Sequence, residues 1–233
     1  MIVVGPSPRE RLPAPVYDLA LRLGIRPDST CLGVRLAQTG RMKMKLGSAA
    51  WMSFTASQTI SIRACEFQWF ARFGPFGLVS ACDALEKDRG RLDIMALGCI
   101  PIARTERSSA LMRGELMRYL AELAWAPHAL LLNTALRWRV NAPDALAVSA
   151  GAGETASEVV LNLDSEGRIA GAFALDRPRS ATEPILPTPW RGRFSDYRLH
   201  NGIWIPFAGE VSWEIKGREE IYWQGRIETW RTD

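Results

Sequence analysis

Cysteine and histidine are scarce in this chain of 233 residues, and neither is arranged for metal or redox chemistry. The four cysteines contain no C-x-x-C pair, so we expect reduced, buried side chains that act as small apolar groups. His128 and His200 have no cysteine or carboxylate at ligand spacing. A zinc or iron centre needs more donors than this, so we expect no metal. The cysteines are Cys31, Cys65, Cys82 and Cys99.

Long apolar runs and clustered positive charge are also missing. No stretch approaches the about 20 residues of a membrane-spanning helix, and the N-terminus lacks the pattern of a secretory signal. We therefore expect a cytoplasmic protein without stable membrane insertion. The net charge of +4 comes almost entirely from scattered arginine, without a recognisable nucleic-acid-binding module. Nucleic acid is accordingly not an expected partner.

Motifs for covalent catalysis and nucleotide binding are absent as well. There is no G-x-S-x-G nucleophile elbow. The segment "GAGE" at 151–154 lies between predicted strands and not at a helix N-terminus, so a hairpin loop fits it better than a phosphate loop. We expect no cofactor.

What the chain does contain is the pattern of one α+β domain spanning residues 1–233. A helical segment is predicted at 1–25, a first strand set at 30–103, a central helix at 108–126 and a second strand set at 136–230. The short links between strands require antiparallel pairing. Nine or more such strands predict one strongly curved sheet, a half-barrel, wrapped around one or two helices.

Local signals support this division. Val16, Leu19 and Leu23 form one stripe of the N-terminal helix, and Gly24 is suited to end it. "DSEG" and "HNG" predict hairpin turns. Pro127 is expected to end or kink the central helix, and the proline-rich segment 178–189 is predicted to be a loop. The apolar stripe of the central helix consists of Leu116, Leu120 and Leu123.

Several blocks of the sequence together resemble a bacterial family of unassigned function, from about residue 30 to the C-terminus. Members of that family are similar to the lipoprotein carriers LolA and LolB, an antiparallel half-barrel around helices. The violacein-pathway enzyme VioE shares this architecture, so the resemblance implies either a carrier of hydrophobic molecules or a cofactor-free enzyme. The blocks are "RLAQTGRM", "WMSFTASQ", "FQWFARF", "RYLAELAWAPHALL", "RWRV", "TPWRGRFSDYR", "NGIWIPFAGEVSW" and "YWQGRI".

Nine tryptophans stand out in a chain of this size. They either fill a large curved core or line a cavity for a planar or lipid-like ligand. Tyr197 and Tyr222 are possible hydroxyl donors, although such residues more often lie on strand surfaces. The candidate ligand-binding residues are Phe67, Trp69, Arg72, Gln58, Trp125, Tyr197, Trp213 and Trp223.

Polar residues interrupt strands that otherwise have a buried pattern, and each buried one needs a partner. These residues are Gln38, Gln58, Gln68, Arg72 and Asp83. On the central helix, Arg118, Glu122 and Trp125 occupy one face at i, i+4 and i+7. This face forms either a structural network tied to Asp83 or part of a functional site.

Three functions are compatible with these features. The first is binding of a small hydrophobic or amphiphilic molecule between the sheet and the central helix. The second is a cofactor-free lyase, isomerase or hydrolase, with Glu122 as acid or base, Arg118 orienting it and His128 as proton shuttle. In that case Asp83 completes the catalytic set. The third is a module that pairs an exposed strand edge with another protein.

Overall fold

The computed structural model describes residues 7–97, 100–104, 108–179 and 185–233. Its main element is an antiparallel sheet of thirteen strands in the order β6-β5-β4-β3-β2-β1-β13-β12-β11-β10-β9-β8-β7. Strands that follow one another in the sequence pair, except β6 and β7, which form the two edges of the sheet, and the β1–β13 pairing joins the first and last strands. The strands are β1 (Gly33–Met42), β2 (Met52–Ser61), β3 (Phe67–Phe73), β4 (Val79–Glu86), β5 (Arg89–Ala96), β6 (Ile100–Arg104), β7 (Arg137–Ala142), β8 (Ala145–Ala150), β9 (Ser157–Leu163), β10 (Ile169–Arg179), β11 (Leu186–His200), β12 (Ile203–Ile215) and β13 (Arg218–Thr232).

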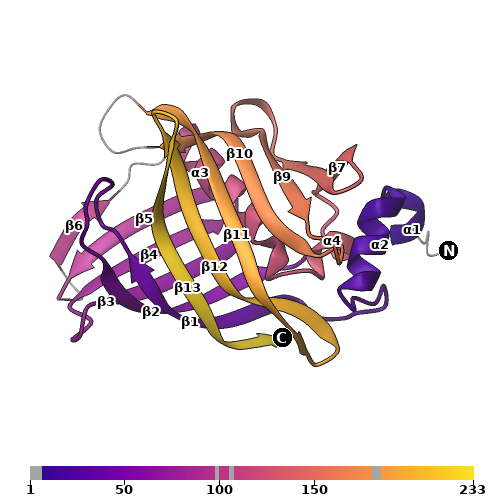
Figure 1. Cartoon of the computed structure of the whole chain (residues 1–233), viewed down its shortest axis with the longest axis horizontal. Coiled ribbons are helices and arrows are strands. Elements are labelled where there is room, and N and C mark those ends of the chain that lie inside the picture. Colours follow the sequence, from indigo (N-terminus) through magenta and orange to yellow (C-terminus); the bar gives the residue numbers. More distant parts are fainter. Residues whose placement is uncertain (1–6, 98–99, 105–107, 180–184) are drawn as a thin grey trace.

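The sheet curls around α3 (Ser109–Ala121), which lies on its concave side (Figure 1). Contacts from α3 reach β4 and β5 on one flank of the sheet and β8, β9 and β10 on the other. The helices α1 (Pro8–Arg11), α2 (Ala14–Arg22) and α4 (Ala129–Leu132) gather at one end of the half-barrel (Figure 1). The predicted fold class is therefore confirmed.

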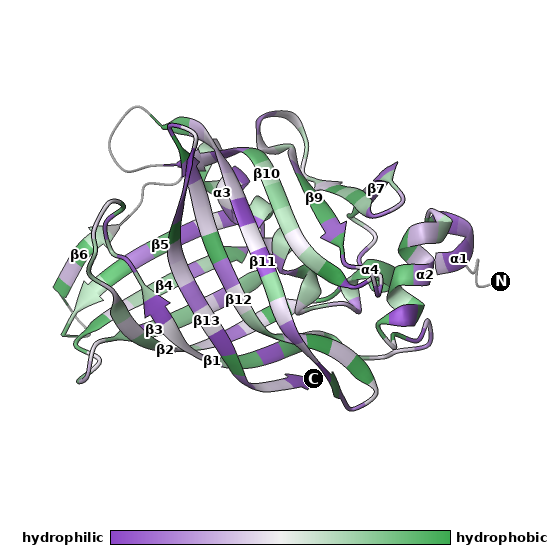
Figure 2. Ribbon diagram, viewed as in Figure 1, coloured by the Kyte–Doolittle hydropathy of each residue, from purple (hydrophilic) through white to green (hydrophobic). Residues whose placement is uncertain are grey.

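Alternation of buried and exposed residues explains the two faces of the sheet. In β3, Phe67, Trp69, Ala71 and Phe73 are buried, while the residues between them are exposed. Apolar and polar side chains alternate along many strands in the same way (Figure 2). The buried set faces α3 and forms one continuous apolar core, as expected when only the concave side of an antiparallel sheet is covered.

The N-terminal segment forms two helices instead of one, because Pro13 stands between them as the N-cap of α2. The predicted stripe of Val16, Leu19 and Leu23 is fully buried. Gly24 adopts a φ of +90°, and the next amide, that of Ile25, donates to the carbonyl of Ala20. This left-handed ending is the role that the sequence assigned to Gly24.

The central helix is shorter than the predicted span of 108–126. After Ala121 it tightens into the single 3₁₀ turn Glu122–Ala124, and α4 follows directly after Pro127. Pro127 has no backbone N–H, so it cannot continue the helical hydrogen bonds. The indole nitrogen of Trp125 donates to the carbonyl of Pro206 on β12, at 3.0 Å, and ties this segment to the sheet. The helix α3 thus ends five residues before the predicted end.

Both predicted hairpin turns are present. Asn201 and Gly202 have φ angles of 50° and 79°, as the two central residues of a type I′ turn require. Asp164 accepts hydrogen bonds from the amides of Glu166 and Arg168 in the β9–β10 turn. The proline-rich segment is not wholly a loop, however, because β10 continues to Arg179 and β11 begins at Leu186; residues 180–184 lie outside the described part.

Candidate functional site

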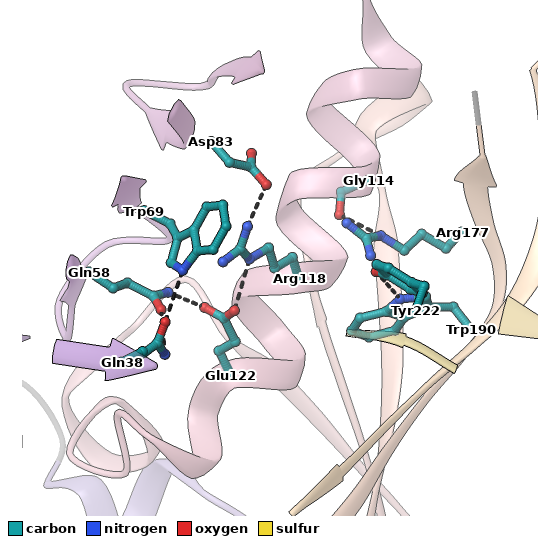
Figure 3. Close-up of polar contacts among 10 residues, drawn as sticks. All are labelled: Gln38, Gln58, Trp69, Asp83, Gly114, Arg118, Glu122, Arg177, Trp190 and Tyr222. Carbon is teal, nitrogen blue, oxygen red and sulfur yellow. Dashed lines mark hydrogen bonds and ion pairs between the residues drawn. The ribbon is translucent and has the colours of Figure 1, made fainter. Parts of the chain in front are cut away.

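A buried arginine on α3 is the centre of a polar cluster (Figure 3). Arg118 forms ion pairs with Asp83 of β4 and, at 2.8 Å, with Glu122 at the end of α3. Its side chain is 15% exposed, and those of the two carboxylates are 13% and 10% exposed. The predicted i, i+4 pair and its link to Asp83 therefore exist in the structure and are largely removed from water.

Two aromatic rings hold the Arg118 guanidinium from the sheet side. It lies 4.8 Å from the ring centre of Phe67 and 5.2 Å from that of Trp69, within the range of cation–π attraction. Burial alone would lower the pKa of Arg118, but the charges of Glu122 and Asp83 outweigh it and hold the pKa above its ordinary value. Arg118 is therefore a permanent cation with two counter-ions.

A relay of side-chain amides connects Trp69 with Glu122. The indole nitrogen of Trp69 donates to Oε1 of Gln38 at 2.9 Å, and Gln38 donates to Gln58 at 3.3 Å. Gln58 in turn donates to Oε2 of Glu122 at 2.5 Å. Both carboxylate oxygens of Glu122 are thus satisfied, one by Gln58 and one by Arg118. The cluster closes on itself, since Trp69 also contacts Arg118.

A second buried acid, Glu115, adjoins this cluster. Its Oε2 and Oδ1 of Asp83 are buried without a hydrogen-bond donor. Burial, and then the negative charge of Asp83, raises the pKa of Glu115 well above the ordinary value. A proton shared between the two carboxyl groups would satisfy both oxygens.

The sequence interpretation missed Glu115, although a signal was available. Residues 115, 118 and 122 follow the i, i+3, i+7 spacing of one helix face. Trp125, in contrast, leaves that face because the helix tightens before it. It packs edge-on against Phe194, with ring centres 5.2 Å apart.

A row of three cross-strand glycines lies beneath the aromatic residues. Gly40, Gly225 and Gly209 are direct partners on β1, β13 and β12. A Cβ atom on Gly40 would lie 2.6 Å from the ring of Phe54, and one on Gly209 would lie 2.9 Å from that of Trp125. A Cβ atom on the middle glycine would overlap the ring of Trp223. Only glycine lets three rings lie this close to the backbone.

A series of aromatic ring contacts connects the row of glycines with Arg118. Trp223 is half-buried and stacks on Phe54 with ring centres 5.8 Å apart. Phe54 meets Trp69 edge-on at the same distance, and Trp69 contacts Arg118. We call Trp223, Phe54 and Trp69 the aromatic track. Two of its members were predicted as ligand-binding residues, while Phe54 was not.

On the other side of α3 lies a second buried arginine (Figure 3). Arg177 of β10 is 8% exposed and donates from Nε to the carbonyl of Gly114 at 3.2 Å. Its guanidinium lies 4.5 Å from the ring centre of Trp190 and 5.6 Å from that of Trp213. Tyr222 stacks on Trp213 and accepts a hydrogen bond from Trp190. Of this group, Trp213 was a predicted binding residue and Tyr222 a predicted hydroxyl donor.

Other predicted residues lie elsewhere. Arg72 and Gln68 are exposed on the outer face of β3, so the prediction that they are buried was wrong. Tyr197 donates to the carbonyl of Ile169 at 2.7 Å. His128 stacks on Trp230 beside α4, and burial lowers its pKa. The structure does not bring these four residues together with Arg118.

No group of three potential metal ligands occurs among the described residues. Cys31, Cys65 and Cys82 are free and half-buried, and burial raises the pKa of Cys65 to about 11; Cys99 lies outside the described part. No helix in the described ranges is long and apolar enough to cross a membrane. An open groove of about 380 Å³ crosses the outer face of β1–β3 and β13, away from α3. Arg72 does not line this groove, and Gln58, which borders it, directs its buried side chain to Glu122 on the other face.

Fold and interior together define a half-barrel protein with a helix on its concave side. The chain belongs to the family of unknown function DUF6920, whose model matches residues 10–231. No curated protein matches the sequence.

Solved structures of similar fold include a DUF1329 family protein from Desulfovibrio piger. It has a TM-score of 0.51 and 12% identity, and the match covers 94% of this chain and 92% of the other. A LolA superfamily protein from Nitrosomonas europaea has a TM-score of 0.48 and 12% identity, with 94% and 93% covered. At 12% identity, the similarity to the Desulfovibrio piger protein describes the fold alone.

Proposed function

We propose that the protein binds a small hydrophobic or amphiphilic molecule on the concave side of the sheet. The observation that carries this proposal is the aromatic track, in which ring contacts lead from half-buried Trp223 to buried Trp69 and Arg118. Flat aromatic faces bind apolar chains and rings through large contact areas. A polar cluster at one end of the track suits a molecule with one polar end.

Half-buried apolar residues at the far end of the sheet, away from α1, α2 and α4, support the same proposal. Met42 pairs with both Met52 and Trp223, so these three side chains lie side by side where β1 ends and β2 begins. Val79, where β4 begins, is also half-buried and packs against the core. A ligand can enter where apolar side chains are still in contact with water.

A role as acid or base catalyst receives less support from Glu122. Both of its oxygens are engaged, one by Gln58 and one by the permanent cation of Arg118, and its side chain is only 10% exposed, which leaves little access for a substrate. Arg118 is likewise engaged by two carboxylates. We therefore propose that this cluster forms the polar end of the binding region.

The proposal is tested by titration with the neutral fluorescent probe N-phenyl-1-naphthylamine. We expect saturable binding to one site, with displacement by added long-chain alcohols. Trp223→Ser should weaken binding by about tenfold, because loss of a buried ring contact costs on the order of 1 kcal/mol or more.

Trp51→Ser is the matched control. Trp51 lies outside the apolar core, where the cations of Arg41 and Lys43 cover its ring. Its replacement should leave the affinity for the probe unchanged. Equal losses in the two variants, or no saturable binding to the wild-type protein, would contradict the proposal.

A further inference from the structure

Arg177 points into the half-barrel because of an irregularity in β10. Ala172 and Ala174 are buried on the concave side, and simple alternation would place Asp176 there next. The β10–β11 register shifts between Ala174 and Arg177, so that Arg177 stands opposite Thr188, itself buried. Such bulges redirect side chains and are common beside functional sites.

Arg177 forms no ion pair with any residue in the described part of the chain. Its Nε donates to a backbone carbonyl, and its two terminal nitrogens donate to no described residue. Glu115 is close enough to interact electrostatically with Arg177, but it forms no ion pair with it, and burial and the charge of Asp83 raise the pKa of Glu115 well above its ordinary value. Arg118, by comparison, has two carboxylate partners. A buried cation is costly unless it is paired, so this difference between two buried arginines calls for an explanation.

The surroundings of Arg177 suit an anion joined to an apolar group. Trp190 and Trp213 present ring faces to the guanidinium. The hydroxyl of Tyr222 accepts from Trp190 at 3.1 Å, and its own proton has no acceptor among the described residues. Unused donors of Arg177 and Tyr222 therefore lie beside the indole of Trp190, within one part of the concave side (Figure 3). Trp213 stacks on Tyr222 in the same place.

We propose that Arg177 and Tyr222 bind the anionic headgroup of an amphiphile, a carboxylate or a phosphate ester carried on an apolar chain. Arginine is suited to both anions because its planar fork donates two parallel hydrogen bonds. The apolar chain would then lie along the aromatic residues of the concave side. This inference rests on the proposed function and adds the chemical class of the ligand.

The test compares four probes that share a ten-carbon chain and differ in the headgroup: decanoate, decyl phosphate, decanol and decyltrimethylammonium. Calorimetric titration of the full-length protein should show that one or both anions bind at least about tenfold more tightly than decanol, as one charge-assisted hydrogen bond provides. The cation should bind more weakly than decanol. Decanoate and decyl phosphate together show which anion fits better.

Arg177→Met keeps the apolar stem and removes the charge. It should reduce the affinity for the anions to that for decanol, leave decanol binding unchanged, and leave the melting temperature equal or higher. Arg191→Met is the control, since Arg191 also covers an aromatic ring, at 4.4 Å, but its side chain is 41% exposed and paired with Glu214. Arg191→Met should change neither the affinity for the anions nor the melting temperature.

The outcomes separate the two proposals. If decanol and the anions bind equally to the wild-type protein, the anionic headgroup is refuted while the hydrophobic ligand stands. If Arg177→Met weakens all four probes alike, Arg177 has a structural role and the inference is overturned. If no probe binds at all, the proposed function fails as well.

Discussion

Replacing Arg118 with methionine leaves Asp83 and Glu122 as buried carboxylates without a cation. Removing one partner of a buried ion pair costs about 3–5 kcal/mol, and loss of the cation–π contacts adds about 1 kcal/mol. The side chains of the cluster keep 10–15% exposure, which favours the lower part of this range. We expect a loss of about 4 kcal/mol of unfolding free energy, or about 8–16 °C in melting temperature for a chain of this length.

Urea unfolding followed by tryptophan fluorescence, together with calorimetry, measures both quantities. Arg139→Met is the matched control, because Arg139 and Glu158 also form an ion pair at 2.8 Å but with side chains 62% and 48% exposed. That change should cost less than about 1 kcal/mol. Combining Arg118→Met with Asp83→Asn and Glu122→Gln should restore at least half of the loss. The reasoning is refuted if Arg118→Met costs no more than the control.

Three further predictions concern pH and packing. Because the pKa of Glu115 is raised, its contribution to stability is lost as pH rises above the ordinary value of 4.5, by up to about 1.4 kcal/mol per pH unit; Glu115→Gln should flatten this slope in pH-dependent urea unfolding, and an unchanged slope contradicts the assignment. Because the pKa of His128 is lowered, stability should fall as pH drops below 6.5; the His128→Phe protein should lose less over the same interval, and parallel curves would exclude this cause. Gly225→Ala should cost about 1–3 kcal/mol by displacing the ring of Trp223, visible as a changed near-ultraviolet dichroism spectrum; an unchanged spectrum and midpoint would show that the ring does not need the glycine.

Much of the interior could be predicted from local patterns. The stripe of Val16, Leu19 and Leu23, and the spacing of Arg118 and Glu122, follow helical geometry, which depends on sequence separation alone. Asp83 could be joined to them because a buried arginine needs acids near it. Sequence and structure agree for these residues because the helical repeat alone determines which of them share a face.

The errors arise where a strand's two faces had to be told apart. Gln68 and Arg72 were assigned to the interior because "EFQWFARFG" is rich in apolar residues, although they alternate with Phe67, Trp69 and Phe73. Strict alternation would have placed both on the outer face.

Arg177 could not be found by any periodic rule. Its inward direction depends on the bulge in β10, which is set by pairing with β11 across a connection and not by the sequence of β10 itself. The same holds for the glycine row, because Gly40 and Gly225 become neighbours only when the first and last strands of the sheet pair.

Native mass spectrometry of the gently purified protein, followed by extraction and identification of any bound molecule, tests the central claim most directly. We predict an added mass that disappears on denaturation and belongs to an apolar chain with a carboxylate or phosphate group, in wild-type protein and much less in Arg177→Met. A protein that carries no such molecule as purified, and that forms no complex after incubation with decanoate or decyl phosphate, would contradict the account.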